Sequence, residues 1–355
     1  MHPCGARRFL ICFLCVLCLL CFAVDAGAPP EPLRFAVIGD SGTGDEHQHR
    51  IAEQMLAWHN RLPFSLVLML GDNIYGGFAG TGGGHRKDFE EKFDRPYRSL
   101  LDRGVVFRAA LGNHDMRHDA GRDLIAEFDR FHIGGPLGYY SFTAGEWLPV
   151  AGAAGLGDED ENDTAPLVEF FVLNTVRLEK KQGDPEQLAW LEQSLAASRA
   201  RWRIVYGHHP LYSTGDRHGS NLEVRRHVEP VLLGAQTGVG LHAEGRPRVN
   251  VVLAGHDHIY QRWLPQYGIV YFVCGSSGKL RRGNARPDAL VAVAEDQLRS
   301  FMLWEATSDE LRFRAINERG QAFDCGTIPA AGRVEAVACD APGGGRAAGL
   351  TPPPN

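Results

Sequence analysis

The chain has 355 residues and a mass of 39.0 kDa, which is enough for one large α/β domain or two smaller domains. Hydrophobic residues make up 44% of the sequence and charged residues 23%, as in ordinary soluble globular proteins. The formal net charge of −6 argues against non-specific binding to nucleic acid, which requires a basic face.

The first segment of the chain has the pattern of a secretory signal. Two arginines precede an apolar run over residues 9–24, and small residues follow it. This order predicts a signal peptide over residues 1–26 and an exported protein, secreted or periplasmic. One alternative is a retained membrane anchor. Another is lipoprotein processing at Cys21, against which the preceding Leu20 weighs, because a small residue is expected there. No later apolar run is long enough to cross a bilayer.

Beyond a short linker, apolar runs of strand character alternate with helical patterns. Residues 46–60 carry Ile51, Met55 and Trp58 at helical spacing, and Asp184-Pro185 supplies an N-cap and a first-turn proline for a helix through residue 197. The strand-like runs lie at 33–38, 65–70, 105–111, 168–173, 203–206, 249–254 and 269–274. This alternation predicts an α/β fold with parallel strand pairs.

The pattern changes after residue 298. Alternating runs at 301–305 and 311–315 predict an antiparallel hairpin. The glycine-rich segment 76–84 is expected to form a mobile loop beside the site, and the acidic run 158–163 a solvated loop. Residues 340–355 are rich in glycine, alanine and proline, which predicts a disordered tail.

Cysteines concentrate in the predicted signal peptide. Five of the eight, Cys4, Cys12, Cys15, Cys18 and Cys21, would leave with it. An exported protein could bridge Cys325 to Cys339 and keep Cys274 as a buried thiol in a strand-like run. The spacing alone leaves this pairing open, and none of the three cysteines has the spacing of a zinc ligand.

Five polar blocks, each directly after an apolar run, carry side chains that bind metals. They are Gly39-Asp40-Ser41-Gly42, Gly71-Asp72-Asn73-Ile74-Tyr75, Gly112-Asn113-His114-Asp115, Val205-Tyr206-Gly207-His208 and Gly255-His256-Asp257-His258. Functional groups of open α/β sheets collect at the carboxyl ends of strands. One such block alone is usually a helix cap, a tight turn or a surface histidine. Five in succession predict a site.

The mixture of side chains suits two metal ions. Two metals about 3.5–4 Å apart can hold both the attacking and the leaving side of a phosphoryl transfer. Such a pair needs a bridging carboxylate, for which Asp72 is the candidate. His256 and His258 alternate along one segment and can serve different metals, while Asn113 offers a neutral oxygen that limits the charge at the second metal.

In this order the blocks resemble those of the calcineurin-like metallophosphoesterases, and more specifically the purple acid phosphatases. Most of that superfamily has Asp-x-His in the first block, whereas this chain has Asp40-Ser41-Gly42 and a tyrosine at position 75, as the purple subgroup does. The resemblance covers residues 33–328 and is greatest to the small, single-domain, tartrate-resistant type. It implies one catalytic domain, a two-sheet β-sandwich flanked by helices (αββα).

The resemblance also implies the ligands of two metal sites. The first site would use Asp40, Asp72, Tyr75 and His258, and the second Asp72, Asn113, His208 and His256, with His209 outside both sets. Hard oxygen donors, including a phenolate, suit a trivalent ion. The implied cofactors are therefore Fe(III) in the first site and Fe(II), Zn(II) or Mn(II) in the second.

The activity implied is hydrolysis of phosphate monoesters at acidic to neutral pH, with metal-bound hydroxide as the nucleophile. His114 would bind the phosphate or protonate the leaving alkoxide, and Asp115 would orient His114. His218, in a loop one residue longer than that of the family, would be a second acid. The expected partner is a small phosphate ester, without nucleic acid or membrane contact beyond the signal segment, and the protein is expected to be a monomer.

Two alternatives stay open from the sequence. One is a phosphodiesterase or nucleotide-cleaving member of the superfamily, against which the missing Asp-x-His weighs. The other is a non-catalytic exported protein that binds metal or phosphate. The presence of every ligand type together with His114 weighs against that alternative.

Overall fold

The computed structural model describes residues 31–76, 84–116, 131–135, 137–149, 164–234, 249–330 and 334–339. The fold described below belongs to one unit that begins at Pro32. The predicted signal peptide (1–26), the acidic run 158–163 and the predicted tail 340–355 lie outside the described residues, as does most of the predicted loop 76–84.

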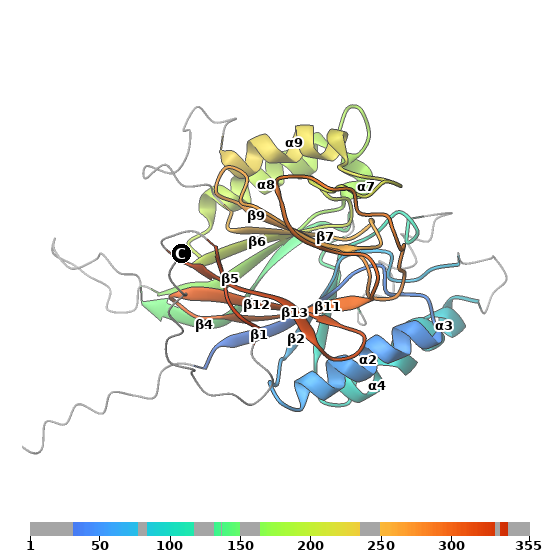
Figure 1. Cartoon of the computed structure of the whole chain (residues 1–355). Helices are drawn as coiled ribbons and strands as arrows, with labels where there is room; N and C mark the ends of the chain where they lie inside the picture. The colour runs from blue at the N-terminus through green and yellow to red at the C-terminus, as the bar shows by residue number, and fades with distance from the viewer. Residues whose placement is uncertain are drawn as a thin grey trace, which may run out of the picture. The chain divides into compact units, whose positions relative to one another are not determined.

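Two mixed sheets of seven strands each form the centre of this unit (Figure 1). Sheet A has the strand order β14-β13-β12-β11-β1-β2-β3, and sheet B the order β10-β8-β9-β7-β6-β5-β4. Sheet A consists of β1 (Leu33–Ile38), β2 (Leu66–Met69), β3 (Val106–Ala109), β11 (Ser300–Ala306), β12 (Glu310–Asn317), β13 (Ala322–Pro329) and β14 (Glu335–Ala336). Sheet B consists of β4 (Tyr140–Pro149), β5 (Thr164–Val172), β6 (Trp202–Tyr206), β7 (Val251–Ala254), β8 (Tyr260–Trp263), β9 (Val270–Cys274) and β10 (Val291–Glu295).

The strand directions agree with the sequence pattern. In sheet A, β1, β2 and β3 run parallel, and in sheet B, β5, β6, β7 and β9 run parallel. The predicted hairpin is β11–β12, an antiparallel pair with Trp304 opposite Phe313. Strand β11 also pairs antiparallel with β1, so the C-terminal hairpin extends sheet A beyond the first strand of the chain.

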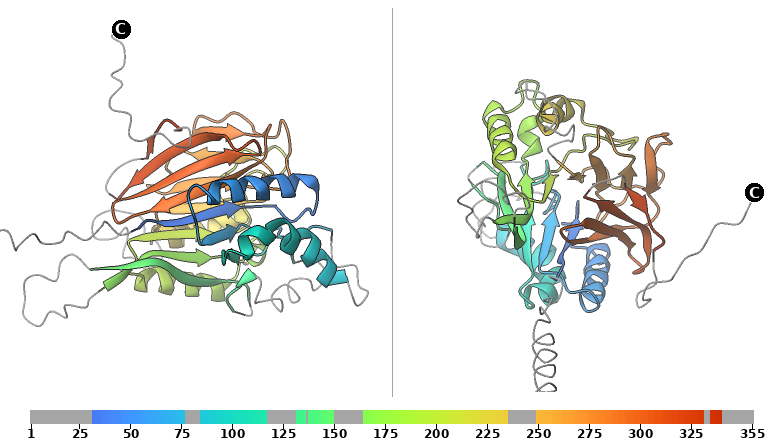
Figure 2. Two further views of the ribbon diagram at one scale, coloured as in Figure 1. Left: turned by 90° about the horizontal axis from the view of Figure 1, so that it is seen from below. Right: turned by 90° about the vertical axis from the view of Figure 1, so that its left-hand side faces the viewer.

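Helices cover the outer face of each sheet (Figures 1 and 2). On the side of sheet A lie α2 (Glu46–His59), α3 (Gly84–Phe89), a π-helical segment η1 (Glu90–Asp94) and α4 (Arg95–Leu101). On the side of sheet B lie α7 (Thr175–Leu178), α8 (Pro185–Ala197) and α9 (Leu222–Leu233). The order helix, sheet, sheet, helix confirms the predicted αββα layering.

The two helices expected from the sequence begin where their capping residues lie. Asp45 accepts hydrogen bonds from the backbone N–H groups of His47 and Gln48, at 3.0 and 3.1 Å, and so satisfies the first amides of α2. Asp184 caps α8 in the same way, with Pro185 in its first turn. The apolar stripe of α2 is buried against the core, as the spacing predicted.

Aromatic side chains join the two sheets face to face. Phe35 of β1 meets Phe170 of β5 edge to face, with ring centroids 5.2 Å apart. Trp304 of β11 meets Phe272 of β9 in the same geometry at 5.3 Å. All four rings are buried, and rings of this size account for a large part of a core's apolar burial. Their packing fixes the spacing of the sheets, and therefore of the strand ends that carry the polar blocks.

The structure contains the disulfide that the sequence permitted. Cys325 on β13 is bonded to Cys339, with a Cα–Cα distance of 5.3 Å, and Cys274 is a buried free thiol. Among the helices of the described residues, none combines the length and the apolar character that a membrane span requires.

Candidate metal centre

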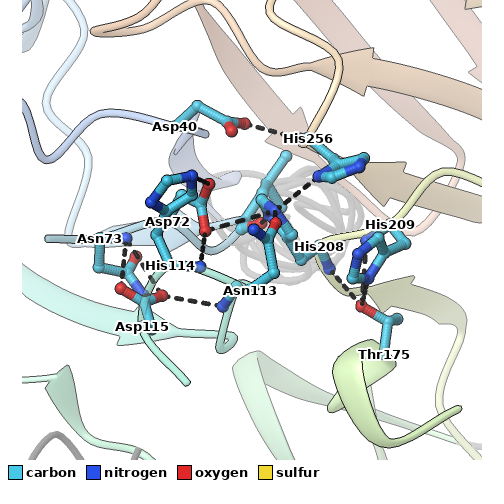
Figure 3. Close-up of polar contacts among 12 residues, drawn as sticks. Asp40, Asp72, Asn73, Asn113, His114, Asp115, Thr175, His208, His209 and His256 are labelled. Carbon is cyan, nitrogen blue, oxygen red and sulfur yellow. Dashed lines mark hydrogen bonds and ion pairs between the residues drawn. The ribbon is translucent and has the colours of Figure 1, made fainter. Parts of the chain in front are cut away.

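The residues predicted as metal ligands lie just beyond the carboxyl ends of strands from both sheets. Sheet A supplies Asp40 after β1, Asp72 and Tyr75 after β2, and Asn113 after β3; sheet B supplies His208 after β6, and His256 and His258 after β7. Figure 3 shows side chains from these loops converging on one region. The face-to-face packing of the sheets thus brings together residues that are far apart in the chain.

The backbone is unusual at three of these positions. Asp40, Asp72 and His256 have φ angles of 53°, 51° and 69°. Side chains other than glycine rarely adopt this left-handed region, and each such residue costs on the order of 1–3 kcal/mol. Strain of this kind persists where the surrounding structure fixes it, and it clusters at functional sites.

Two glycines allow the β2 and β3 loops to touch. Gly71 has a φ of 91°, and a Cβ there would lie 2.7 Å from Nδ1 of His208 and 2.9 Å from the Cα of Gly112. A Cβ on Gly112 would lie 2.2 Å from Oδ1 of Asp72. No side chain fits at either position. The glycines before Asp72 and Asn113 are therefore required by the close approach of the two loops.

The first cluster of donor atoms surrounds the phenol of Tyr75. Its hydroxyl lies 2.9 Å from Oδ1 of Asp40 and 3.2 Å from Nε2 of His258. Nε2 of His258 is also 3.4 Å from the same Asp40 oxygen. These three side chains belong to the predicted first metal site, and the structure brings their ligand atoms together.

The second cluster surrounds the imidazole of His208. Its Nε2 lies 3.0 Å from Oδ1 of Asn113, 3.1 Å from Nδ1 of His256 and 3.4 Å from Oδ1 of Asp72 (Figure 3). The four residues are those predicted for the second site. His208 is completely buried, and its orientation is fixed because Nδ1 donates to the backbone carbonyl of Leu70 at 3.0 Å.

Asp72 lies between the two clusters. Ligand atoms of Asp40, Asp72 and His208 all lie within 4.8 Å of one another. The negative charge of Asp72 helps to raise the pKa of Tyr75 in the first cluster. Its Oδ1 faces His208 in the second cluster. This position agrees with its predicted role as the carboxylate shared by two metals.

The chemistry of the donor set fits cations. Because Nδ1 of His208 donates to Leu70, the ring atom available to a metal is Nε2, which faces the Asn113 oxygen and a nitrogen of His256. Burial opposes protonation of His208, but the charges of Asp72 and Asp40 raise its pKa. Burial, together with the charge of neighbouring histidines, holds the pKa of His256 well below its usual range and keeps the ring neutral. Imidazole nitrogens and an amide oxygen are ligand types that divalent metals accept.

In the first cluster the phenol of Tyr75 donates a hydrogen bond to Asp40. Burial raises the pKa of the Tyr75 phenol, and the carboxylates of Asp40 and Asp72 raise it further. The protein alone therefore keeps the phenol protonated. A bound cation reverses the sign of this local field and favours the phenolate.

Comparison with known proteins assigns the family. The model of the calcineurin-like phosphoesterase family matches residues 33–260. The chain belongs to this family. It is 28% identical to purple acid phosphatase 17 of Arabidopsis thaliana, over 72% of this chain and 71% of that protein. It is 26% identical to tartrate-resistant acid phosphatase type 5 of Homo sapiens, over 84% of this chain and 90% of that protein.

A solved structure shares the fold of this phosphoesterase. The purple acid phosphatase from yellow lupin (Lupinus luteus) seeds superposes with a TM-score of 0.61 at 16% identity, over 85% of this chain and 55% of that one. The resemblance predicted from the five polar blocks is thus confirmed, and the relatives imply a dimetal centre in this phosphoesterase.

Asp115 joins the loops that follow β2 and β3. It is fully buried, and its carboxylate accepts hydrogen bonds from the backbone N–H groups of Asn73, Ile74 and Gly112 at 2.8–3.1 Å, and from the Asn73 amide at 2.8 Å (Figure 3). These contacts fasten the β2 loop to the β3 loop. These hydrogen bonds position the loops that carry Asp72 and Asn113, and the predicted orientation of His114 by Asp115 stays a prediction.

His114 lies next to Asp72 at the edge of the donor clusters. Its backbone N–H donates to Oδ1 of Asp72 at 2.8 Å, and its ring nitrogen Nε2 lies 4.0 Å from Oδ2 of the same residue. The ring packs against Tyr75, with centroids 4.6 Å apart. The side chain is 29% exposed, so it borders both clusters and remains accessible to a ligand.

His218 lies beside the second cluster, in the loop that is predicted to be one residue longer than the corresponding loop of the family. Its ring packs on His256 with centroids 4.2 Å apart. Asp257 anchors this loop: its Oδ2 accepts hydrogen bonds from the Ser213 hydroxyl at 2.6 Å and from the Gly219 N–H at 3.0 Å. The sequence singled out neither Ser213 nor this role of Asp257, because the contact joins residues 44 apart in the chain.

Thr175 holds the backbone of His208 and His209 next to the second cluster. The Thr175 hydroxyl accepts from the backbone N–H groups of His208 and His209, at 3.2 and 3.0 Å, and lies 2.9 Å from Nδ1 of His209 (Figure 3). The other nitrogen of His209 faces Glu179 at 3.3 Å. Both ring nitrogens of His209 thus have partners in the protein. Ligand atoms of His208, His209 and His256 nevertheless all lie within 4.8 Å of one another, so the exclusion of His209 from the ligands stays a prediction.

Proposed function

We propose that the protein hydrolyses small phosphate monoesters at acidic to neutral pH through a binuclear metal centre. Asp40, Asp72, Tyr75 and His258 would hold Fe(III), and Asp72, Asn113, His208 and His256 would hold Fe(II), Zn(II) or Mn(II). The observation that carries the proposal is the phenol of Tyr75, whose oxygen lies within 3.2 Å of ligand atoms of both Asp40 and His258.

The donor set supports the difference between the two sites. The first cluster contains a carboxylate and a phenol in addition to the shared Asp72, and such hard oxygen donors suit a trivalent ion. The second cluster contains two imidazoles and a neutral amide oxygen, which suit a divalent ion. When bound, the cations would supply the positive charge that neutralises the phosphoryl oxygens and promotes ionisation of water at neutral or acidic pH.

The protein's own residues would handle the proton of the leaving group. His114 borders the shared carboxylate and is partly exposed, so it can reach the ester oxygen and donate a proton from its ring as the bond to phosphorus breaks. His218 approaches from the opposite loop, beside His256. It would contact the ester on that side of the centre.

The test is a visible spectrum with metal analysis of the purified protein. We expect a violet or pink colour from charge transfer between tyrosinate and Fe(III), together with two metals per chain. Tyr75→Phe should lose the colour and keep the fold, because only the hydroxyl is removed from a buried ring. A colourless wild type with stoichiometric zinc would contradict the iron assignment, and a Tyr75→Phe variant that keeps its colour would contradict the ligand.

A further inference from the structure

Two basic side chains lie against the backbone of the first metal cluster. The ammonium group of Lys279 lies 4.7 Å from the ring centroid of Tyr75, within the range of a cation–π contact. The backbone N–H of Lys279 donates to the carbonyl of Asp40, and that of Arg281 donates to the carbonyl of His258, both at 3.0 Å. The segment 279–281 is thus held beside the ligands of the first site, and both side chains are partly exposed.

A third basic residue approaches from the loop of His218. The backbone N–H of Arg217 donates to the Asn284 side chain at 3.0 Å, and that of Asp216 donates to the Asn284 carbonyl at 2.7 Å. These bonds join the His218 loop to the segment after Arg281. Arg217 is adjacent in the chain to His218, whose ring packs on His256 with centroids 4.2 Å apart. The backbone of Arg217 therefore lies beside the metal centre.

Several basic residues near these three are paired with a carboxylate. Arg286 is paired with Asp216 at 2.7 Å, Lys92 with Asp88 at 2.6 Å, and Arg299 with Glu318 at 3.7 Å. Within the part of the chain that the structure describes, Lys279, Arg281 and Arg217 form no ion pair with a carboxylate. In a chain of net charge −6, uncompensated positive charge beside a site favours the binding of an anion there.

We propose that Lys279, Arg281 and Arg217 form an anion subsite beside the metal centre, which binds a second anionic group on the leaving part of the substrate. This inference rests on the proposed phosphatase function, because it adds a contact for the part of the ester that the metals do not hold. The substrate class is a small phosphate ester with two anionic groups, such as a bisphosphate, a diphosphate or a phosphorylated carboxylic acid.

Two esters that differ by one anionic group provide the test. Phenyl phosphate and 3-carboxyphenyl phosphate release phenols of similar acidity, so the ratio of their kcat/KM values reports the second group. We expect wild-type enzyme to prefer the carboxylated ester. The double variant Lys279→Gln, Arg281→Gln should lower this ratio by roughly five- to tenfold, because a charged contact at the rim is lost.

The matched control removes one positive charge from the same segment. Arg282 is exposed, and its side chain donates to the backbone carbonyl of Gln297 at 3.2 Å. Arg282→Gln should therefore leave the substrate ratio of the wild type unchanged. The inference is overturned if the wild type shows no preference, if the double variant weakens both esters equally, or if Arg282→Gln lowers the ratio as much as the double variant does.

A binding measurement separates this inference from the proposed function. If metal-loaded wild type does not hydrolyse phenyl phosphate, the phosphatase proposal fails, and calorimetric titration with methylphosphonate and methylenediphosphonate still tests the subsite. Tighter binding of the diphosphonate to the wild type, lost in the double variant, supports the subsite. If the wild type and the double variant bind the diphosphonate with equal affinity, the subsite is overturned. Circular dichroism and thermal melting establish that the compared variants are folded.

Discussion

Tyr75 and Asp72 show how single residues define the centre. The phenol of Tyr75 contributes an oxygen to the first cluster, where Asp-x-His would contribute an imidazole. Asp72 lies between the clusters with a left-handed backbone, and its neighbours Gly71 and Gly112 leave no space for a side chain. Under the proposed assignment, the identity of the first ion would depend on one phenol, and the position of the Asp72 carboxylate depends on two glycines.

His114 gives a prediction for the chemical step. His114→Ala should lower turnover by roughly 10²–10⁴-fold, because a positioned proton donor contributes about that much, and should leave the metal content intact. The loss should be smaller for p-nitrophenyl phosphate than for an alkyl phosphate, because the nitrophenolate leaves without protonation. Steady-state rates on both esters, with metal analysis of the same preparation, measure this. An equal loss on both esters, or loss of metal, would argue against a proton donor.

Gly71 gives a prediction for assembly of the site, with Gly104 as its control. Both glycines have positive φ angles, 91° and 77°, but a Cβ meets atoms of His208 and Gly112 at Gly71 and nothing within 4 Å at Gly104. Gly104→Ala should cost about 1 kcal/mol in free energy of unfolding from backbone conformation. Gly71→Ala should cost about 1–3 kcal/mol more and should lose metal. Denaturant unfolding and metal analysis would show equal effects only if the contact is unimportant.

At the scale of helices and strands, local sequence patterns predicted the elements that carry the ligands. Strands β1, β2, β6, β7 and β9 are buried along nearly their whole length, so they appear as apolar runs ended by glycine and polar residues. Helices α2 and α8 have side-chain caps that can be recognised from the sequence.

The elements that the sequence did not predict depend on tertiary contacts. Strand β8 contains Gln261 and Arg262, both buried, and Arg262 is paired with Asp324 of β13 at 2.8 Å. Strand β10 alternates between exposed and half-buried positions at a sheet edge. The support given to the site by Thr175, Ser213 and Lys279 comes from contacts between segments distant in sequence, for which no local pattern exists.

The loop that carries His218 gives a prediction at this scale. Ser213→Ala removes the hydrogen bond to Asp257 and the one from the Gly215 N–H, each worth about 1 kcal/mol. The loop should then populate other conformations, and turnover should fall by roughly two- to tenfold while metal content stays constant. Ser198→Ala, at the end of α8, is the control without contact to the site. Wild-type turnover in Ser213→Ala would show that this anchor does not position His218.

At the scale of the whole molecule, ion pairs across sheet A link stability to pH. Glu305 of β11 accepts hydrogen bonds from Arg34 of β1 at 2.9 Å and from Arg314 of β12 at 2.6 Å. Burial would raise the pKa of Glu305, but the two arginines lower it below its usual 4.5. A depressed pKa in the folded state contributes stability above pH 4.5, which is lost as the pH falls through the folded value.

Glu305→Gln tests this linkage. The variant should lose about 1–2 kcal/mol in free energy of unfolding at pH 7, since the pair is mostly buried but both arginines keep partial solvent contact. The difference from the wild type should shrink as the pH falls below 4.5 and through the lowered pKa of the folded carboxyl, because Glu305 then becomes protonated. Urea unfolding at pH 7 and pH 3.5 measures both values. A difference that does not depend on pH would mean that Glu305 stabilises the sheet by packing rather than by charge.

The division of ligands between the two sheets also sets an order in time. Asp40, Asp72, Tyr75 and Asn113 come from sheet A and offer oxygen, whereas His208, His256 and His258 come from sheet B and offer nitrogen. A growing polypeptide that has emerged only as far as residue 113 contains every proposed oxygen ligand and none of the proposed histidine ligands. If the proposed ligand sets hold, neither coordination shell can be completed until translation has passed His258, so metal capture would be a late step of maturation.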